Sequence, residues 1–200
     1  MRILRWTAAG MALLALTSCG VFFAPLEGRW NPLDPKFGEG YTEKTLYTTE
    51  DGFVMAPTTR DFASPLMRLS SSSRILMKFS TADIPSNVAY AELSLYLDNS
   101  VLPDSAGFVV RLVLMDWDPM YVDEVQISSV GFLAPLASAA VSPQNPGWYS
   151  WNVTSLLQSV APSSVKGLFI EPEDTTGGME RVFRTHENGT DWPHLAIWTR

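Results

Sequence analysis

The chain has 200 residues, 46% of them hydrophobic and 18% charged, and its formal net charge at pH 7 is −7. This composition predicts a globular protein with one domain, and the negative charge argues against nucleic acid as a partner. The 14 prolines and 13 glycines separate short apolar runs, a pattern typical of an all-β protein. Cys19 is the only cysteine, so the fold cannot depend on a disulfide within the chain.

Residues 1–19 have the parts of a secretory signal: two arginines, a short apolar run and a small-residue end. The apolar run, from Trp6 to Leu16, is shorter than the roughly 20 residues of a membrane-spanning helix. The end, Leu-Thr-Ser-Cys, resembles a bacterial lipobox, which implies cleavage before Cys19 and acylation of this cysteine. We therefore expect a protein of the bacterial cell envelope, anchored to the membrane by lipid on its periplasmic or surface face, rather than one with an ordinary cleaved signal.

The rest of the chain divides into a tether and one folded domain. Residues 20–42 are rich in proline and glycine and have no periodic pattern, so we expect a tether. Residues 43–200 predict an antiparallel β-sandwich of about eight to nine strands with one short helix. The strands are expected at residues 45–56, 74–80, 89–98, 108–117, 125–133, 148–153, 165–171, 181–187 and 194–199.

Three of these segments carry more detailed expectations. In residues 89–98, Ala91, Leu93, Leu95 and Leu97 should face the core while the residues between them face solvent. Residues 108–117 are apolar on both faces apart from Arg111, which indicates a central strand or one covered by a loop. Asp51-Gly52 predicts a hairpin turn or a kink within residues 45–56, and Thr154 predicts the N-cap of a helix over residues 155–160.

Several segments, in this order, resemble the DNRLRE-type domains of bacterial and archaeal surface proteins. They read SRILMKFSTADIPSNVAYAELSLYLDNS, WDP, GWYSWNVTSLLQS, VKGLFIEPED and FRTHENGTDWPHLAIW, and the similarity covers most of residues 50–200. Asn152 stands where an aspartate is usual in that family. The resemblance implies a jelly-roll β-sandwich and kinship with carbohydrate-binding modules found beside polysaccharide-degrading enzymes, including alginate lyases.

Aromatic residues on predicted outer faces or in loops are the candidates for a sugar site: Trp148, Trp192, Tyr96 and Tyr121. Trp198 also falls on a predicted outer face, whereas Trp151 and Phe169 are expected in the core. A ring that covers one sugar face hides roughly 75 to 100 Å² of apolar surface, which contributes about 2 kcal/mol. Two such rings would reach the roughly 4 kcal/mol of a millimolar binder.

Carboxylates that could converge at one end of the sandwich are the candidates for a structural calcium site. Calcium prefers oxygen ligands, and the candidate ligands are Glu50, Asp51, Glu171, Glu173, Asp174 and Glu187. The alternative is a solvated acidic rim. Two basic pairs, Arg74 with Lys78 and Arg181 with Arg184, are the places where an acidic polysaccharide could bind against the net negative charge.

No serine lies in a nucleophile-elbow context near His186 or His194, and Pro172 separates Glu171 from Glu173, so we expect no catalytic residues. The sequence thus predicts a non-catalytic, membrane-anchored lipoprotein whose sandwich binds carbohydrate. The alternative is a structural envelope lipoprotein whose sandwich binds another protein. Outward apolar residues on one strand, Val109, Val113 and Met115, would fit that alternative.

Overall fold

The computed structural model describes residues 40–56, 59–100, 106–174 and 179–200. Within it, Thr42–Arg200 forms one compact unit. The predicted signal, the lipidation residue Cys19 and nearly all of the predicted tether lie outside the described residues. None of the helices in the described ranges combines the length and the apolar character needed to cross a bilayer.

The described chain is built from antiparallel strands and a few short helices. The strands are β1 (Thr42–Tyr47), β2 (Glu50–Met55), β3 (Thr59–Asp61), β4 (Leu66–Ser70), β5 (Ser73–Lys78), β6 (Val88–Ser100), β7 (Phe108–Val113), β8 (Leu133–Ala137), β9 (Gly147–Asn152), β10 (Gly167–Pro172), β11 (Glu180–Arg184) and β12 (His194–Thr199). Two α-helices, α2 (Glu124–Ile127) and α3 (Thr154–Gln158), and three 3-10 turns, η3 (Thr81–Asp83), η4 (Pro162–Ser164) and η5 (His186–Asn188), connect them.

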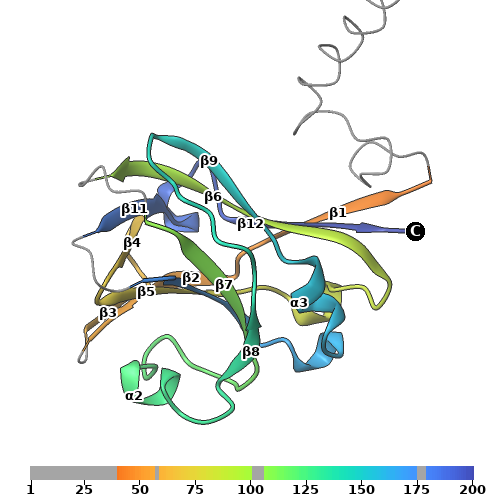
Figure 1. Cartoon of the computed structure of the whole chain (residues 1–200), viewed down its shortest axis with the longest axis horizontal. Helices are drawn as coiled ribbons and strands as arrows, with labels where there is room; N and C mark the ends of the chain where they lie inside the picture. Colours follow the sequence, from red (N-terminus) through yellow and green to blue (C-terminus); the bar gives the residue numbers. More distant parts are fainter. Residues whose placement is uncertain (1–39, 57–58, 101–105, 175–178) are drawn as a thin grey trace, which may run out of the picture. The chain divides into compact units, whose positions relative to one another are not determined.

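The strands form one continuous sheet that curls into two facing layers (Figure 1). One layer contains β1, β12, β6 and β9, and the other contains β3, β2, β5, β10, β7 and β8; β11 and β4 join them. The first strand pairs with the last, and the chain crosses repeatedly between the layers, as in a jelly roll. The predicted all-β antiparallel sandwich is confirmed, with twelve strands in the described ranges rather than eight to nine.

The main core lies between the two layers and follows the predicted alternation of β6. Ala91, Leu93, Leu95 and Leu97 are all fully buried and face the opposite layer. Trp151 of β9 is also fully buried, and its indole Nε1 donates to the carbonyl of Phe108 at 2.8 Å. Because these side chains occupy the inner face, the alternate residues of β6 and β9 must point outward.

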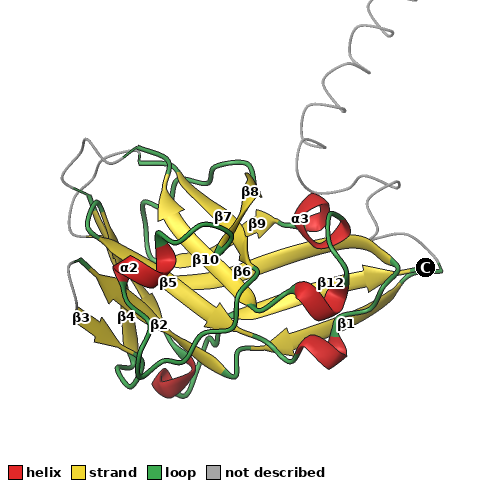
Figure 2. Cartoon of the chain, turned by 90° about the horizontal axis from the view of Figure 1, so that it is seen from below, coloured by secondary structure: helices red, strands yellow, loops and turns green. Residues whose placement is uncertain are grey.

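A second, smaller core covers the outer face of the other layer. Residues 114–132 cross this face, and α2 lies over the strands that include β5 and β10 (Figure 2). Trp117 and Phe132 from the covering segment pack against Val113 and Phe169 of the sheet. This confirms that a loop covers the strand predicted at residues 108–117. It also corrects the expectation for Val109 and Val113, which are buried rather than outward.

Three local predictions were wrong. Residues 125–133 form α2 and a turn rather than a strand, because the Asp123 carboxylate accepts a hydrogen bond from the backbone of Gln126 and begins a helix. Asp51 and Gly52 lie inside β2, so the hairpin-turn alternative for this pair is wrong. Thr154 is the first residue of α3, not its cap, and its hydroxyl accepts a hydrogen bond from the backbone N–H of Ala91 at 2.9 Å.

Candidate functional site

Aromatic side chains gather on the outer face of the layer formed by β1, β12, β6 and β9. Tyr47 at the end of β1 is paired with His194 at the start of β12. Tyr96 of β6 is paired with Trp148 of β9, two strand positions from the pairing of His194 with Ser94. The register therefore places these four rings on neighbouring positions of one sheet face.

Contacts between ring edges and faces link these side chains into one aromatic surface. The ring centroids of Trp148 and His194 lie 5.0 Å apart, and those of Tyr96 and Trp148 lie 5.6 Å apart. Trp192, in the loop before β12, meets Tyr47 at 5.8 Å and an interplanar angle of 89°. Such T-shaped pairs are favourable beyond the area that they bury, so the rings support one another. We call these five residues the aromatic platform.

The platform borders a hollow of about 490 Å³. Tyr47, Trp148 and Trp192 line it and remain 53%, 45% and 41% exposed, although large aromatic side chains are usually more buried. The other lining residues are His194 and the loop Gly189, Thr190 and Asp191. The hollow thus combines exposed aromatic faces with a few polar groups, which is the usual composition of a small-molecule site.

An ion-paired arginine supports one side of the platform. The Arg184 guanidinium bonds to Asp98 at 3.0 Å and to Asp191 at 2.5 Å, and it lies 4.4 Å from the ring centroid of Tyr96. The hydrogen bond to Asp98 raises the pKa of Arg184 above its usual value. Asp191 has a φ of 55°, a left-handed conformation that aspartate tolerates better than most residues. Arg184 therefore holds both the Tyr96 ring and the loop beside the hollow.

The structure brings together three of the four predicted ligand residues. Trp148 and Trp192 line the hollow and Tyr96 contacts Trp148, whereas Tyr121 lies in the covering segment before α2. Tyr47 and His194 were missed, although Tyr47 lies in a predicted strand whose alternation could have marked it as outward-facing. As predicted, Trp151 and Phe169 are in the core; Trp198 is buried as well.

Most of the six predicted calcium ligands lie in different surroundings. Glu171 bonds to Arg111 at 2.5 Å, and Glu50 lies opposite Lys78 in the ladder of β2 and β5. Glu173 and Asp174 are exposed after β10. In the described ranges, one group of three metal-ligating side chains has its ligand atoms within 4.8 Å of one another, and it contains Asp51 with His186 and Glu187. Two of the predicted ligands, Asp51 and Glu187, thus lie together, and the other four do not belong to that group.

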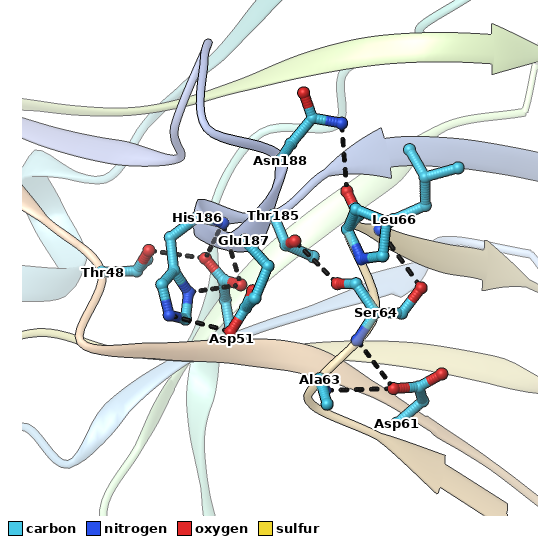
Figure 3. A network of polar contacts seen from close by, with 11 residues as sticks. Thr48, Asp51, Asp61, Ala63, Ser64, Leu66, Thr185, His186, Glu187 and Asn188 are labelled. Carbon is cyan, nitrogen blue, oxygen red and sulfur yellow. Dashed lines mark hydrogen bonds and ion pairs between the residues drawn. The ribbon is translucent and has the colours of Figure 1, made fainter.

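Asp51, His186 and Glu187 form a polar cluster under η5 (Figure 3). The Asp51 carboxylate is fully buried and accepts hydrogen bonds from the Thr48 hydroxyl at 2.5 Å and from the backbone N–H of His186 at 3.2 Å. The His186 ring contacts Asp51 through Nδ1 at 3.0 Å and Glu187 through Nε2 at 2.9 Å. Because carboxylates occupy both ring nitrogens, His186 is not placed to activate a hydroxyl nucleophile.

The two predicted basic pairs do not form open cationic patches. Arg181 is fully buried and donates to the carbonyls of Pro143 and Glu180. Arg184 is paired as described above, and Arg74 donates to the backbone carbonyls of the turn at residues 70–73. Lys78 donates to the carbonyl of Trp117 at 2.5 Å and lies over its ring. These cations are thus engaged within the protein.

No protein-family model and no curated protein sequence matches the chain.

Proposed function

We propose that the protein is a lipid-anchored lipoprotein of the bacterial cell envelope whose sandwich binds a polysaccharide without cleaving it. The observation that carries this proposal is the aromatic platform, with Tyr47, Trp148 and Trp192 exposed around one hollow. Apolar C–H faces of sugars stack on such rings. The resemblance to DNRLRE-type domains supports the same class of ligand.

The size of the platform agrees with weak, polymer-directed binding. One ring that covers a sugar face contributes about 2 kcal/mol, so two rings supply roughly the 4 kcal/mol of a millimolar site. Affinity of this size is useful on a polymer, where many equivalent sites keep the local ligand concentration high, or when several anchored copies bind one chain. A lipid anchor provides such an array on the membrane.

We propose a neutral rather than an acidic polysaccharide as the ligand. The chain carries a formal charge of −7, which repels polyuronates. Arg184, which lies over the Tyr96 ring of the platform, is neutralised by Asp98 and Asp191, so it offers little net attraction for a sugar carboxylate. Hydroxyl groups of a neutral sugar can instead bond to Asp191, Thr190 and the His194 ring, which border the hollow.

A binding screen tests the carbohydrate proposal. The full-length chain in detergent micelles is presented with neutral polymers (β-glucans, xylan and mannan) and with polyuronates such as alginate. We expect millimolar binding to at least one neutral polymer and weaker or no binding to the polyuronates. Binding to polyuronates alone would contradict the neutral-ligand proposal, and no binding to any polymer by the folded protein would contradict the carbohydrate proposal.

The proposed lipid anchor is tested separately. Cells that express the chain are fed a labelled fatty acid, and incorporation into the protein is compared between the natural sequence and Cys19→Ser. We expect label only in the natural sequence, with the serine variant released from the membrane fraction. Equal labelling of the two proteins would contradict acylation at Cys19.

A second candidate function is a protein-binding role in the envelope. The segment that contains α2 exposes several large apolar side chains, among them Met120, Tyr121, Val125 and Val130. Exposed apolar groups of this kind are common at protein interfaces. A photocrosslinking residue at Val125 distinguishes the two functions, since a specific crosslinked envelope protein, together with no polysaccharide binding, would favour this second role.

A further inference from the structure

The cluster of Asp51, His186 and Glu187 joins two parts of the chain that are far apart in sequence. Asp51 is the second residue of β2, and the two partners belong to η5, which starts 135 residues later. A buried carboxylate is costly unless it is paired and hydrogen-bonded. The pairing of Asp51 with η5 is therefore a strong constraint on where η5 lies.

The His186 ring links the two carboxylates of the cluster. Its Nδ1 lies 3.0 Å from Asp51, and its Nε2 lies 2.9 Å from Glu187. Figure 3 shows the contacts of the imidazole with the two carboxylates and the hydrogen bond from Thr48 to Asp51.

Each side of the cluster leads directly to one wall of the hollow. Thr48, which donates to Asp51, follows Tyr47, and its backbone N–H contacts the carbonyl of Pro193. On the other side, η5 continues through Gly189 and Asp191, both in left-handed conformations, to Trp192. The segment before Asp51 therefore carries Tyr47. The segment after His186 carries Trp192, whose ring contacts Tyr47.

A second set of contacts fixes η5 from the opposite side. The Thr185 hydroxyl donates to the carbonyl of Ser64 at 2.7 Å, and its N–H donates to the carbonyl of Pro65 at 3.1 Å. Asn188 also contacts the carbonyl of Pro65 (Figure 3). These bonds and the cluster together anchor η5, from which the loop to Trp192 starts.

We propose that Asp51, His186 and Glu187 are positioning residues that hold Trp192 against Tyr47 and so shape the ligand hollow. Their effect on the Tyr47–Trp192 contact is independent of the ligand, whereas their effect on affinity rests on the proposed carbohydrate function. The alternative is a cation site, since the ligand atoms are close enough for one. Asp51 already contacts three polar groups of the protein, the Thr48 hydroxyl and the backbone N–H and ring Nδ1 of His186, so the protein itself provides partners for both of its oxygens.

The test follows Trp192 directly by fluorine NMR. The full-length chain is labelled with 5-fluorotryptophan in detergent micelles, and the Trp192 and Trp151 signals are assigned from Trp192→Phe and Trp151→Phe. Trp151 lies in the main core and reports whether the sandwich remains folded. The variants are His186→Gln, Glu187→Ala and Glu187→Gln, with Glu173→Gln as a matched exposed control.

In His186→Gln and Glu187→Ala we expect the Trp192 signal to move toward its position in the unfolded chain while the Trp151 signal stays in place. Glu187→Gln keeps an acceptor for Nε2 and should give a smaller change, and Glu173→Gln should give none. Affinity for the neutral polymer should fall by up to about 30-fold, the value for losing one stacked ring.

The outcomes separate this inference from the proposed function. A Trp192 signal unchanged in all variants would overturn the positioning role. A moved Trp192 signal with unchanged polymer affinity would overturn its role in binding. If the natural sequence binds no polymer but Trp192 moves as expected, the positioning role holds and the carbohydrate proposal fails. Binding of added Zn²⁺ or Ca²⁺ that shifts Trp192 in the natural sequence but not in His186→Gln would overturn the hydrogen-bonded cluster in favour of a cation site.

Discussion

Trp148 of β9 and Tyr96 of β6 are cross-strand partners whose ring centroids lie 5.6 Å apart at an interplanar angle of 86°. Tyr96 is in turn covered by the Arg184 guanidinium, so the exposed indole rests on a supported ring. An aromatic side chain held in this way loses little conformational entropy when a ligand stacks on it. The pair therefore explains how an exposed tryptophan can be both rigid and available.

We expect Trp148→Ala to weaken polysaccharide binding about 30-fold, because it removes about 2 kcal/mol of stacking. Affinity gel electrophoresis on the full chain measures the change. Stability should change little, since the side chain is 45% exposed. Tyr121→Ala is the matched control: Tyr121 is 72% exposed but lies outside the hollow, so this variant should bind like the natural sequence. Equal loss in the two variants would contradict a site at the platform.

The parts of the fold that the sequence predicted are those with a regular local pattern. The alternation of β6 identified both its buried leucines and its outward Tyr96, because each strand face is set by residues two apart. The strand predicted at residues 125–133 was wrong. There, the hydrogen bond from the backbone N–H of Gln126 to the Asp123 carboxylate starts a helix instead. Arg181 was predicted as part of a basic pair at the surface, but it is buried, and the backbone carbonyl of the distant Pro143 accepts a hydrogen bond from it.

Some residues of the candidate site could be predicted from local sequence features, and others could not. Trp148 and Trp192 were predicted because exposed aromatics in loops and on outer faces suggest ligand contact without any knowledge of the fold. The partnership of Asp51 with His186 could not be predicted, since it joins positions 135 residues apart and neither position has a local motif. The grouping of Tyr47 with His194 depends on the pairing of the first strand with the last, which only the topology provides.

We expect Gly52→Ala to destabilise the protein by about 1 to 3 kcal/mol, because the new methyl group would overlap the carbonyl oxygen of Asp61 and the Cα atom of Phe62. Both atoms belong to the backbone, so this overlap can be removed only if the backbone at residues 61 and 62 moves. Gly107→Ala is the control, since its nearest contact is the flexible end of Glu173. Urea denaturation measures both variants, and equal midpoints would contradict the close approach at Gly52.

The ion pair between Lys44 of β1 and Asp83 of η3, at 2.7 Å, predicts a small dependence of stability on pH. The hydrogen bond from Lys44 lowers the pKa of Asp83 below the ordinary value of 3.8. A carboxyl group whose pKa is lowered by folding stabilises the protein above its unfolded pKa and loses this effect as the pH falls through the folded pKa.

We therefore expect Asp83→Asn to lower the melting temperature at pH 7 by at most about 3 °C, because both side chains are half-exposed and solvent screens them. The difference from the natural sequence should shrink as the pH falls below 3.8. Lys44→Gln and the double variant complete a thermodynamic cycle that isolates the pair. A difference that grows in acid would show that the sign of this linkage is wrong.

The dispersed carboxylates predict how the sandwich responds to calcium. Glu171 is paired with Arg111, and Asp51 is satisfied by Thr48 and His186, so calcium would have to replace existing bonds to bind either of them. We expect 1 mM calcium, compared with chelator, to change the melting temperature of the full chain by less than about 1 °C. A site with a dissociation constant near 10 μM would instead stabilise by about 2.7 kcal/mol and raise the melting temperature by roughly 5 °C or more. Magnesium at the same concentration is the control for ionic strength, and a rise specific to calcium would place a cation site among these carboxylates after all.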